Sequence, residues 1–170
     1  MTVLVVGVGN IFLGDDGFGV EVIRRLSGVD LPGWVEVVDY GIRGMHLAYD
    51  LVAVDHDLTI MVDATVQGDP PGTVYVIELD LPEPSAPAPL LDAHGMQPDV
   101  VMGLVAVLGG HPGRVLLVGC EPAVLEHRMS LSPAVEQAVD TAVRVVVDLI
   151  DKYPFGTQEE LACALASLGK

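Results

Sequence analysis

Three side chains suited to binding one divalent metal ion occur at widely separated points of the sequence. Asp16 lies in the glycine-rich run GVGNIFLGDDGFG, Asp63 ends the apolar run LTIMVD, and His94 stands in LDAHGMQPD. Two carboxylate oxygens and one imidazole nitrogen form a mixed donor set that suits zinc, nickel or a similar ion. Three protein ligands also leave a coordination position open, as reactive and recognition sites require. We therefore consider Asp16, Asp63 and His94 as candidate metal ligands and catalytic residues.

Each of these residues also has an ordinary structural interpretation. Asp16 could cap a helix, Asp63 could stand in a turn, and His94 could be a hydrogen-bonded surface residue. A charged Asp63 at the end of an apolar strand would be costly to bury unless it paired or bound a cation. Composition and spacing alone leave both interpretations open.

The same glycine-rich run could instead bind a dinucleotide. Gly7 and Gly9 fit a G-x-G turn after a strand, and Asp39 ends the next strand, where an acid could bind a ribose. However, Phe12 occupies the third glycine position, and Asp15 and Asp16 stand where a pyrophosphate would bind a helix N-terminus. Two carboxylates repel a phosphate, so this alternative is less favoured.

No serine or cysteine has an evident base partner in the sequence. Cys120 ends a Val-rich run without a neighbouring histidine, which favours a packing role over a nucleophile. The only other cysteine, Cys163, forms no metal-binding spacing with it, and we expect both thiols to be reduced. The remaining histidines are expected at the surface: His46, His56, His111 and His127.

Short apolar runs alternate with segments of helical period, which is typical of successive βαβ units. Strands are predicted over residues 2–8, 34–39, 58–63, 72–79 and 114–119. Helices are predicted over residues 17–27, 45–54, 98–109 and, after an N-cap at Ser132, through about 151. The expected fold is α/β, with a single doubly wound, mostly parallel sheet of about five strands and helices on both faces. In such a sheet, functional groups gather beyond the carboxyl ends of the strands.

We expect one domain over residues 1–153, followed by a C-terminal tail over 154–170. The proline-rich segment 81–93 reads as a loop leading to His94, since too little chain follows for a second core. The tail is compatible with one short helix, because Thr157 and Glu160 match a capping box.

The chain of 170 residues is strongly acidic, with a formal net charge of −16. That charge disfavours nucleic acid and anionic membranes as partners. The longest apolar stretch, residues 100–110, is too short to span a bilayer, and the N-terminus reads as a strand, not a signal peptide. A cytoplasmic location is expected.

Six segments together resemble the maturation endopeptidases of nickel–iron hydrogenases. They are GVGNIFLGDDGFG, DYGIRGMHLAYDL, VDA, the segment around His94, VGCEP and LSPAVEQAV, and the similarity extends over about residues 2–150. The resemblance implies an α/β endopeptidase that removes a short C-terminal extension from the precursor of the hydrogenase large subunit after nickel insertion. It also places Asp16, Asp63 and His94 at the three metal-ligand positions, with nickel carried by the substrate and zinc or cadmium able to substitute.

Two departures from the family pattern are visible. Tyr40, Gly41 and Ile42 stand where members commonly have two glycines and a threonine, and the tail after about residue 152 has no clear counterpart. A non-enzymatic, nickel-dependent maturation chaperone remains an alternative function, and a dinucleotide-binding oxidoreductase a less favoured one.

Overall fold

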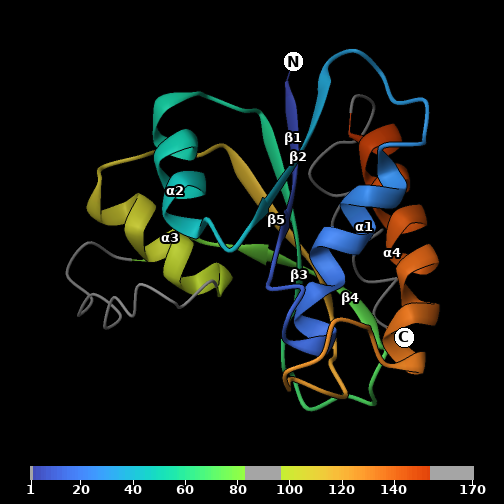
Figure 1. Cartoon of the computed structure of the whole chain (residues 1–170). Helices are drawn as coiled ribbons and strands as arrows, with labels where there is room; N and C mark the ends of the chain where they lie inside the picture. Colours follow the sequence, from blue (N-terminus) through green and yellow to red (C-terminus); the bar gives the residue numbers. More distant parts are fainter. Residues whose placement is uncertain (1, 83–96, 154–170) are drawn as a thin grey trace.

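A five-stranded sheet forms the centre of the molecule. The structure, a computed structural model, describes residues 2–82 and 97–153. The strand order is β2-β1-β3-β5-β4 (Figure 1). Four strands are parallel and the edge strand β4 runs antiparallel to β5, with these bounds: β1 Val3–Val8, β2 Val35–Gly41, β3 Leu58–Ala64, β4 Val74–Leu79 and β5 Arg114–Cys120. The predicted α/β fold is confirmed.

Helices cover both faces of the sheet. On one face lie α1 (Phe18–Leu26) and α4 (Pro133–Lys152), and on the other lie α2 (Gly44–Ala53) and α3 (Pro98–Val107) (Figure 1). Successive strand residues point to opposite faces, so the two helical layers enclose two separate apolar cores. In β3, for example, Ile60 and Val62 join the core under α1 and α4, whereas Met61 joins the other.

The burial of each strand explains its place in the sheet. β1 and β3 are buried along their whole length, as apolar strands covered on both faces must be. β4 is only partly buried, in accordance with its edge position. The longest helix, α4, begins as predicted: Ser132 is its N-cap, its Oγ accepts a hydrogen bond from Val135 N at 3.5 Å, and Pro133 is the first helical residue.

Glycine allows α1 to approach the carboxyl ends of β1 and β3 closely. A Cβ atom at Gly19 would collide with the carbonyl oxygens of Val8 and Val62. One turn earlier, the 3₁₀ helix η1 (Gly14–Gly17) connects β1 to α1 and carries Asp15 and Asp16. The sequence therefore brings η1 directly beside the end of β3, where Asp63 stands.

Among the residues that the structure describes, no helix is long and apolar enough to cross a membrane. The segment 83–96, with His94, and the tail 154–170 lie outside the described residues. The domain boundary at 153 and the tail helix therefore stay predictions.

Candidate active site

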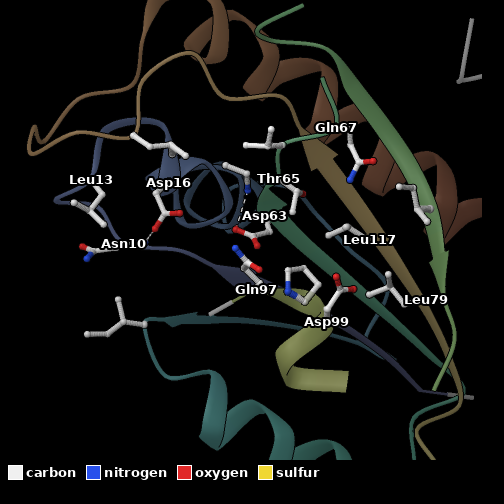
Figure 2. Close-up of a pocket in the computed structure, with 16 residues that line it drawn as sticks. Asn10, Leu13, Asp16, Asp63, Thr65, Gln67, Leu79, Gln97, Asp99 and Leu117 are labelled. Atoms are coloured by element: carbon white, nitrogen blue, oxygen red, sulfur yellow. Dashed lines mark hydrogen bonds between the residues drawn. The ribbon is translucent and has the colours of Figure 1, made fainter. Parts of the chain in front are cut away.

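Asp16 and Asp63 lie on one cavity at the carboxyl-end edge of the sheet. Its volume is about 660 Å³, and Figure 2 shows both carboxylates directed into it. Asp16 comes from η1 after β1, and Asp63 from the end of the neighbouring strand β3. Residues 47 positions apart thus line the same space, as the topology of a parallel sheet predicts. Other polar side chains on its wall are Asn10, Thr65, Gln67, Gln97 and Asp99.

Asp63 is a buried carboxylate with few partners. Its side chain is 4% exposed, and Oδ1 accepts a hydrogen bond from the backbone N–H of Ala64 at 2.8 Å. Burial and then the negative charge of Asp16 hold the pKa of Asp63 well above its usual range, and the Ala64 bond only partly opposes this. A cation in the cavity would offset both effects by stabilising the ionised carboxylate.

Asp16 is more accessible and is oriented by the loop that follows β1. Its Oδ2 accepts a hydrogen bond from Asn10 N at 2.6 Å, and Asn10 Oδ1 in turn accepts one from Phe12 N at 3.0 Å. Burial raises the pKa of Asp16, and the Asn10 bond opposes that shift. The N-cap of α1 is Gly17, with no side-chain capping bond, so Asp16 does not act as the cap of that helix.

The adjacent Asp15 has a different role. It is fully buried and binds the segment before α4: Oδ2 accepts bonds from Ala123 N and Val124 N, both at 2.8 Å, and both of its oxygens bind Ser132. Burial alone would raise the pKa of Asp15, but the hydrogen bonds from Ser132, Val124 and Ala123 together hold it below its usual value. Asp15 is therefore an ionised structural carboxylate, and Asp16 alone of this pair faces the cavity.

The charge of the cavity suits a cation. Within the described part of the chain, no lysine or arginine lines it, whereas Asp16, Asp63 and Asp99 do. The described residues contain no group of three or more His, Cys, Asp or Glu side chains placed to hold a metal ion. Because His94 lies outside them, the complete three-ligand site stays a prediction, and the structure brings together two of its members.

A thiol nucleophile is not supported by the surroundings of Cys120. The side chain is buried in the core under α1 and α4, on the sheet face opposite to Leu117, which lines the cavity. Burial, with the charges of Asp15 and Glu121, raises the pKa of Cys120 to about 12. A thiol in this state is not a nucleophile near neutral pH, as the sequence predicted.

Sequence reasoning missed much of the cavity wall. Ile77, Leu79 and Leu117 form an apolar part of it, and Thr65, Val66 and Gln67 form another wall after β3. The apolar residues could not be found, because their place depends on β4 pairing with β5 in the antiparallel direction. Gln97 and Asp99 could have been found from the sequence. Pro98 marks the start of a helix, and in alternating βα units the helices begin at the carboxyl-end edge of the sheet.

Comparison with known proteins decides the family. The hydrogenase maturation protease family matches residues 20–149 of the chain. The chain belongs to this family. It is 34% identical over 149 residues to the hydrogenase 2 maturation protease of Escherichia coli K12, a match covering 86% of this chain and 89% of that protein.

Solved structures of hydrogenase maturation proteases share the fold. The E. coli hydrogenase maturating endopeptidase HybD is 32% identical, with a TM-score of 0.71 over 90% of this chain and 94% of that one. The hydrogenase 2 maturation peptidase of a Thaumarchaeota archaeon is 33% identical, with a TM-score of 0.68 over 89% and 99% of the two chains. The protein is thus a peptidase, as the sequence predicted. The family match begins after Asp16, so the role of Asp16 rests on the geometry of the cavity.

Proposed function

We propose that this hydrogenase maturation protease is an endopeptidase that removes the C-terminal extension of a nickel-loaded hydrogenase large-subunit precursor. In this proposal Asp16, Asp63 and His94 recognise the nickel ion that the precursor carries. The observation that carries the proposal is the pair Asp16 and Asp63 on one acidic cavity, where the buried Asp63 lacks a cationic partner among the described residues. The proposed setting is the cytoplasm.

The donor chemistry of the site fits a divalent ion. Two carboxylates held close together in a partly buried space repel each other, and a cation between them would relieve that repulsion. Nickel accepts both oxygen and imidazole ligands. A nickel ion bound here would supply positive charge next to the scissile peptide, and zinc or cadmium could take its place in a loaded crystal.

The sequence position of His94 supports its place in the proposal. Gln97 lines the cavity and follows His94 by three residues. Three residues of chain reach at most about 11 Å.

The remaining residues of the cavity would hold the peptide and admit water. A volume of about 660 Å³ accommodates a short stretch of extended peptide. No serine or cysteine lines the cavity in the part of the chain that the structure describes, and the Thr65 hydroxyl is buried. We therefore assign the attack on the peptide carbonyl to water. Its hydrolysis leaves a new carboxylate on the large subunit and a new amine on the released extension.

A cleavage assay tests the proposal directly. Precursor large subunit is incubated with the protease, with and without nickel, and the mass of its C-terminus is followed. We expect cleavage only of the nickel-loaded precursor, and loss of cleavage in Asp16→Asn and Asp63→Asn. Asp148→Asn, a carboxylate change on the exposed side of α4 and away from the cavity, is the matched control and should stay active.

Three outcomes would change the assignment. Equal cleavage without nickel would remove the sensing role of Asp16, Asp63 and His94. A cognate nickel-loaded precursor left whole by the wild-type protein would remove the proposed substrate. Nickel-dependent binding with no change in mass would instead support the chaperone alternative.

A further inference from the structure

The loop that follows β3 is a wall of the cavity and is anchored by one buried and one partly buried side chain. We call residues 65–68 the wall loop; Thr65, Val66 and Gln67 line the cavity. The first anchor is Glu121, which is 5% exposed and follows β5. Its Oε2 accepts hydrogen bonds from Gln67 N at 2.7 Å and from Gly68 N at 3.1 Å. One carboxylate oxygen therefore holds the far end of the wall loop.

The second anchor is Tyr75 on the edge strand β4. Its hydroxyl donates a hydrogen bond to Thr65 O at 2.8 Å, while Thr65 N donates to Cys120 O at 3.0 Å. The ring reaches this position over Gly119: a Cβ atom there would lie 2.6 Å from Tyr75 Oη and would collide with the ring. Gly119 pairs with both Asp63 and Tyr75 across the sheet. The lack of a side chain at Gly119 thus makes room for the Tyr75 ring between β4 and the position of Asp63 on β3.

These contacts leave the wall loop little backbone freedom. One end is bonded to the partly buried Tyr75 on β4 and the other to the buried Glu121 that follows β5, whereas Val66 between them is 65% exposed. A surface that is held in one conformation before binding loses less entropy when a ligand docks on it. The arrangement is suited to presenting a fixed wall to an extended peptide.

We propose that Glu121 is a positioning residue of this protease, which acts through the wall loop to hold the substrate chain in the cavity, with Tyr75 as its partner at the other end of the loop. This inference rests on the proposed endopeptidase function. Glu121 itself does not line the cavity, so it acts through the amides of Gln67 and Gly68. The wall loop contacts the substrate equally before and during bond cleavage, and its loss should therefore weaken binding more than it slows the chemical step.

Two substitutions at Glu121 separate this role from simple loss of the charge. Both bonds go to a single oxygen, so Glu121→Gln can keep them with its amide oxygen, whereas Glu121→Ala cannot. With nickel-loaded precursor as the substrate, we expect Glu121→Ala to raise KM about tenfold while kcat changes less than about twofold. Glu121→Gln should stay within about twofold of wild type in both constants. Tyr75→Phe, which keeps the ring over Gly119, should raise KM in the same direction as Glu121→Ala.

A merely structural role makes a different prediction. Partial unfolding lowers the active fraction, which reduces the apparent kcat and leaves the KM of the folded fraction unchanged. Asp148→Ala is the matched control, since it removes an exposed carboxylate on α4, on the other face of the sheet. Hydrogen exchange should show faster exchange at the Gln67 and Gly68 amides in Glu121→Ala than in Glu121→Gln.

The failure of this inference can be distinguished from the failure of the proposed function. A folded Glu121→Ala variant with wild-type KM would overturn the positioning role, and so would Glu121→Gln if it were impaired as strongly as Glu121→Ala. If the wild-type protein does not cleave the precursor, the proposed function fails by itself. In that case precursor binding tests the role of Glu121. A higher dissociation constant for Glu121→Ala than for Glu121→Gln would support it, and equal constants would overturn it.

Discussion

Removing the charge of Asp63 should make the metal-free protein more stable. Asp63→Asn keeps an oxygen that can accept the bond from Ala64 N, but it removes a negative charge that is 4% exposed and close enough to Asp16 for repulsion. The cost of burying an ionised carboxylate is on the order of several kcal/mol. One hydrogen bond to a charged acceptor returns about 1.5 to 3 kcal/mol. The difference leaves a net penalty of roughly 2 kcal/mol in the wild-type protein.

We therefore expect Asp63→Asn to raise the free energy of unfolding by about 2 kcal/mol at pH 7.5, which corresponds to roughly 4 to 8 °C in Tm for a chain of this size. The assay is urea unfolding followed by circular dichroism, with a chelator present. Asp99→Asn is the control, because Asp99 is exposed in the first turn of α3 on the same cavity. The free energy of unfolding of Asp99→Asn should stay within about 0.5 kcal/mol of the wild-type value.

The stability gain of Asp63→Asn should depend on pH, and the direction of that dependence follows from the pKa of Asp63. The pKa of Asp63 is raised in the folded state, so the folded protein holds this proton more tightly than the unfolded chain. The penalty is absent below the unfolded pKa of about 3.9, grows as the pH rises toward the folded pKa, and is constant above it. The stability gain of Asp63→Asn should shrink accordingly as the pH falls to about 4. A gain that does not vary with pH, or no gain at pH 7.5, would refute this reasoning.

Three further predictions concern the framework of the site. Asp15→Ala should lower the free energy of unfolding by about 3 to 4 kcal/mol in urea titrations, because Ala123 N, Val124 N and Ser132 lose a shared acceptor; a loss under 1 kcal/mol would contradict it. Gly19→Ala should cost about 3 kcal/mol or prevent folding, since its Cβ atom meets two backbone carbonyls, and a folded variant of wild-type Tm would show that α1 can shift freely. Cys120 should resist iodoacetamide at pH 8 in the folded protein and react in urea, because burial raises its pKa to about 12. Peptide mass spectrometry distinguishes Cys120 from Cys163, and labelling of Cys120 in the native protein would contradict its burial.

The sequence predicted the elements of the fold well, for reasons visible in the structure. The runs TVLVVGV and LTIMVD are continuous apolar stretches because β1 and β3 are covered on both faces. Ser132 followed by Pro133 predicted the start of α4 because capping depends on neighbouring residues only. Local signals of this kind are complete in the sequence itself.

The different roles of neighbouring site residues depend on contacts with distant parts of the chain, so the sequence could not predict them in the same way. Asp15 and Asp16 are chemically equivalent neighbours, and only the positions of Ala123 and Ser132 make the first a structural residue. The role of Glu121 likewise requires the wall loop to fold back on β5, as its bond to Gln67 shows. Asp16 and Asp63 line one cavity because parallel strands place their carboxyl ends at one edge, and their role as metal ligands stays a prediction.

The contacts of Asp15 have a consequence for how the protein responds to heat. Ser132, which binds both oxygens of Asp15, is also the N-cap of α4, the longest helix. The turn that carries Asp16 and the start of α4 are thus joined at a single buried carboxylate. Loosening of the acidic turn would release Ser132 from Asp15, so the loss of catalytic activity on warming should be accompanied by fraying of the first turn of α4.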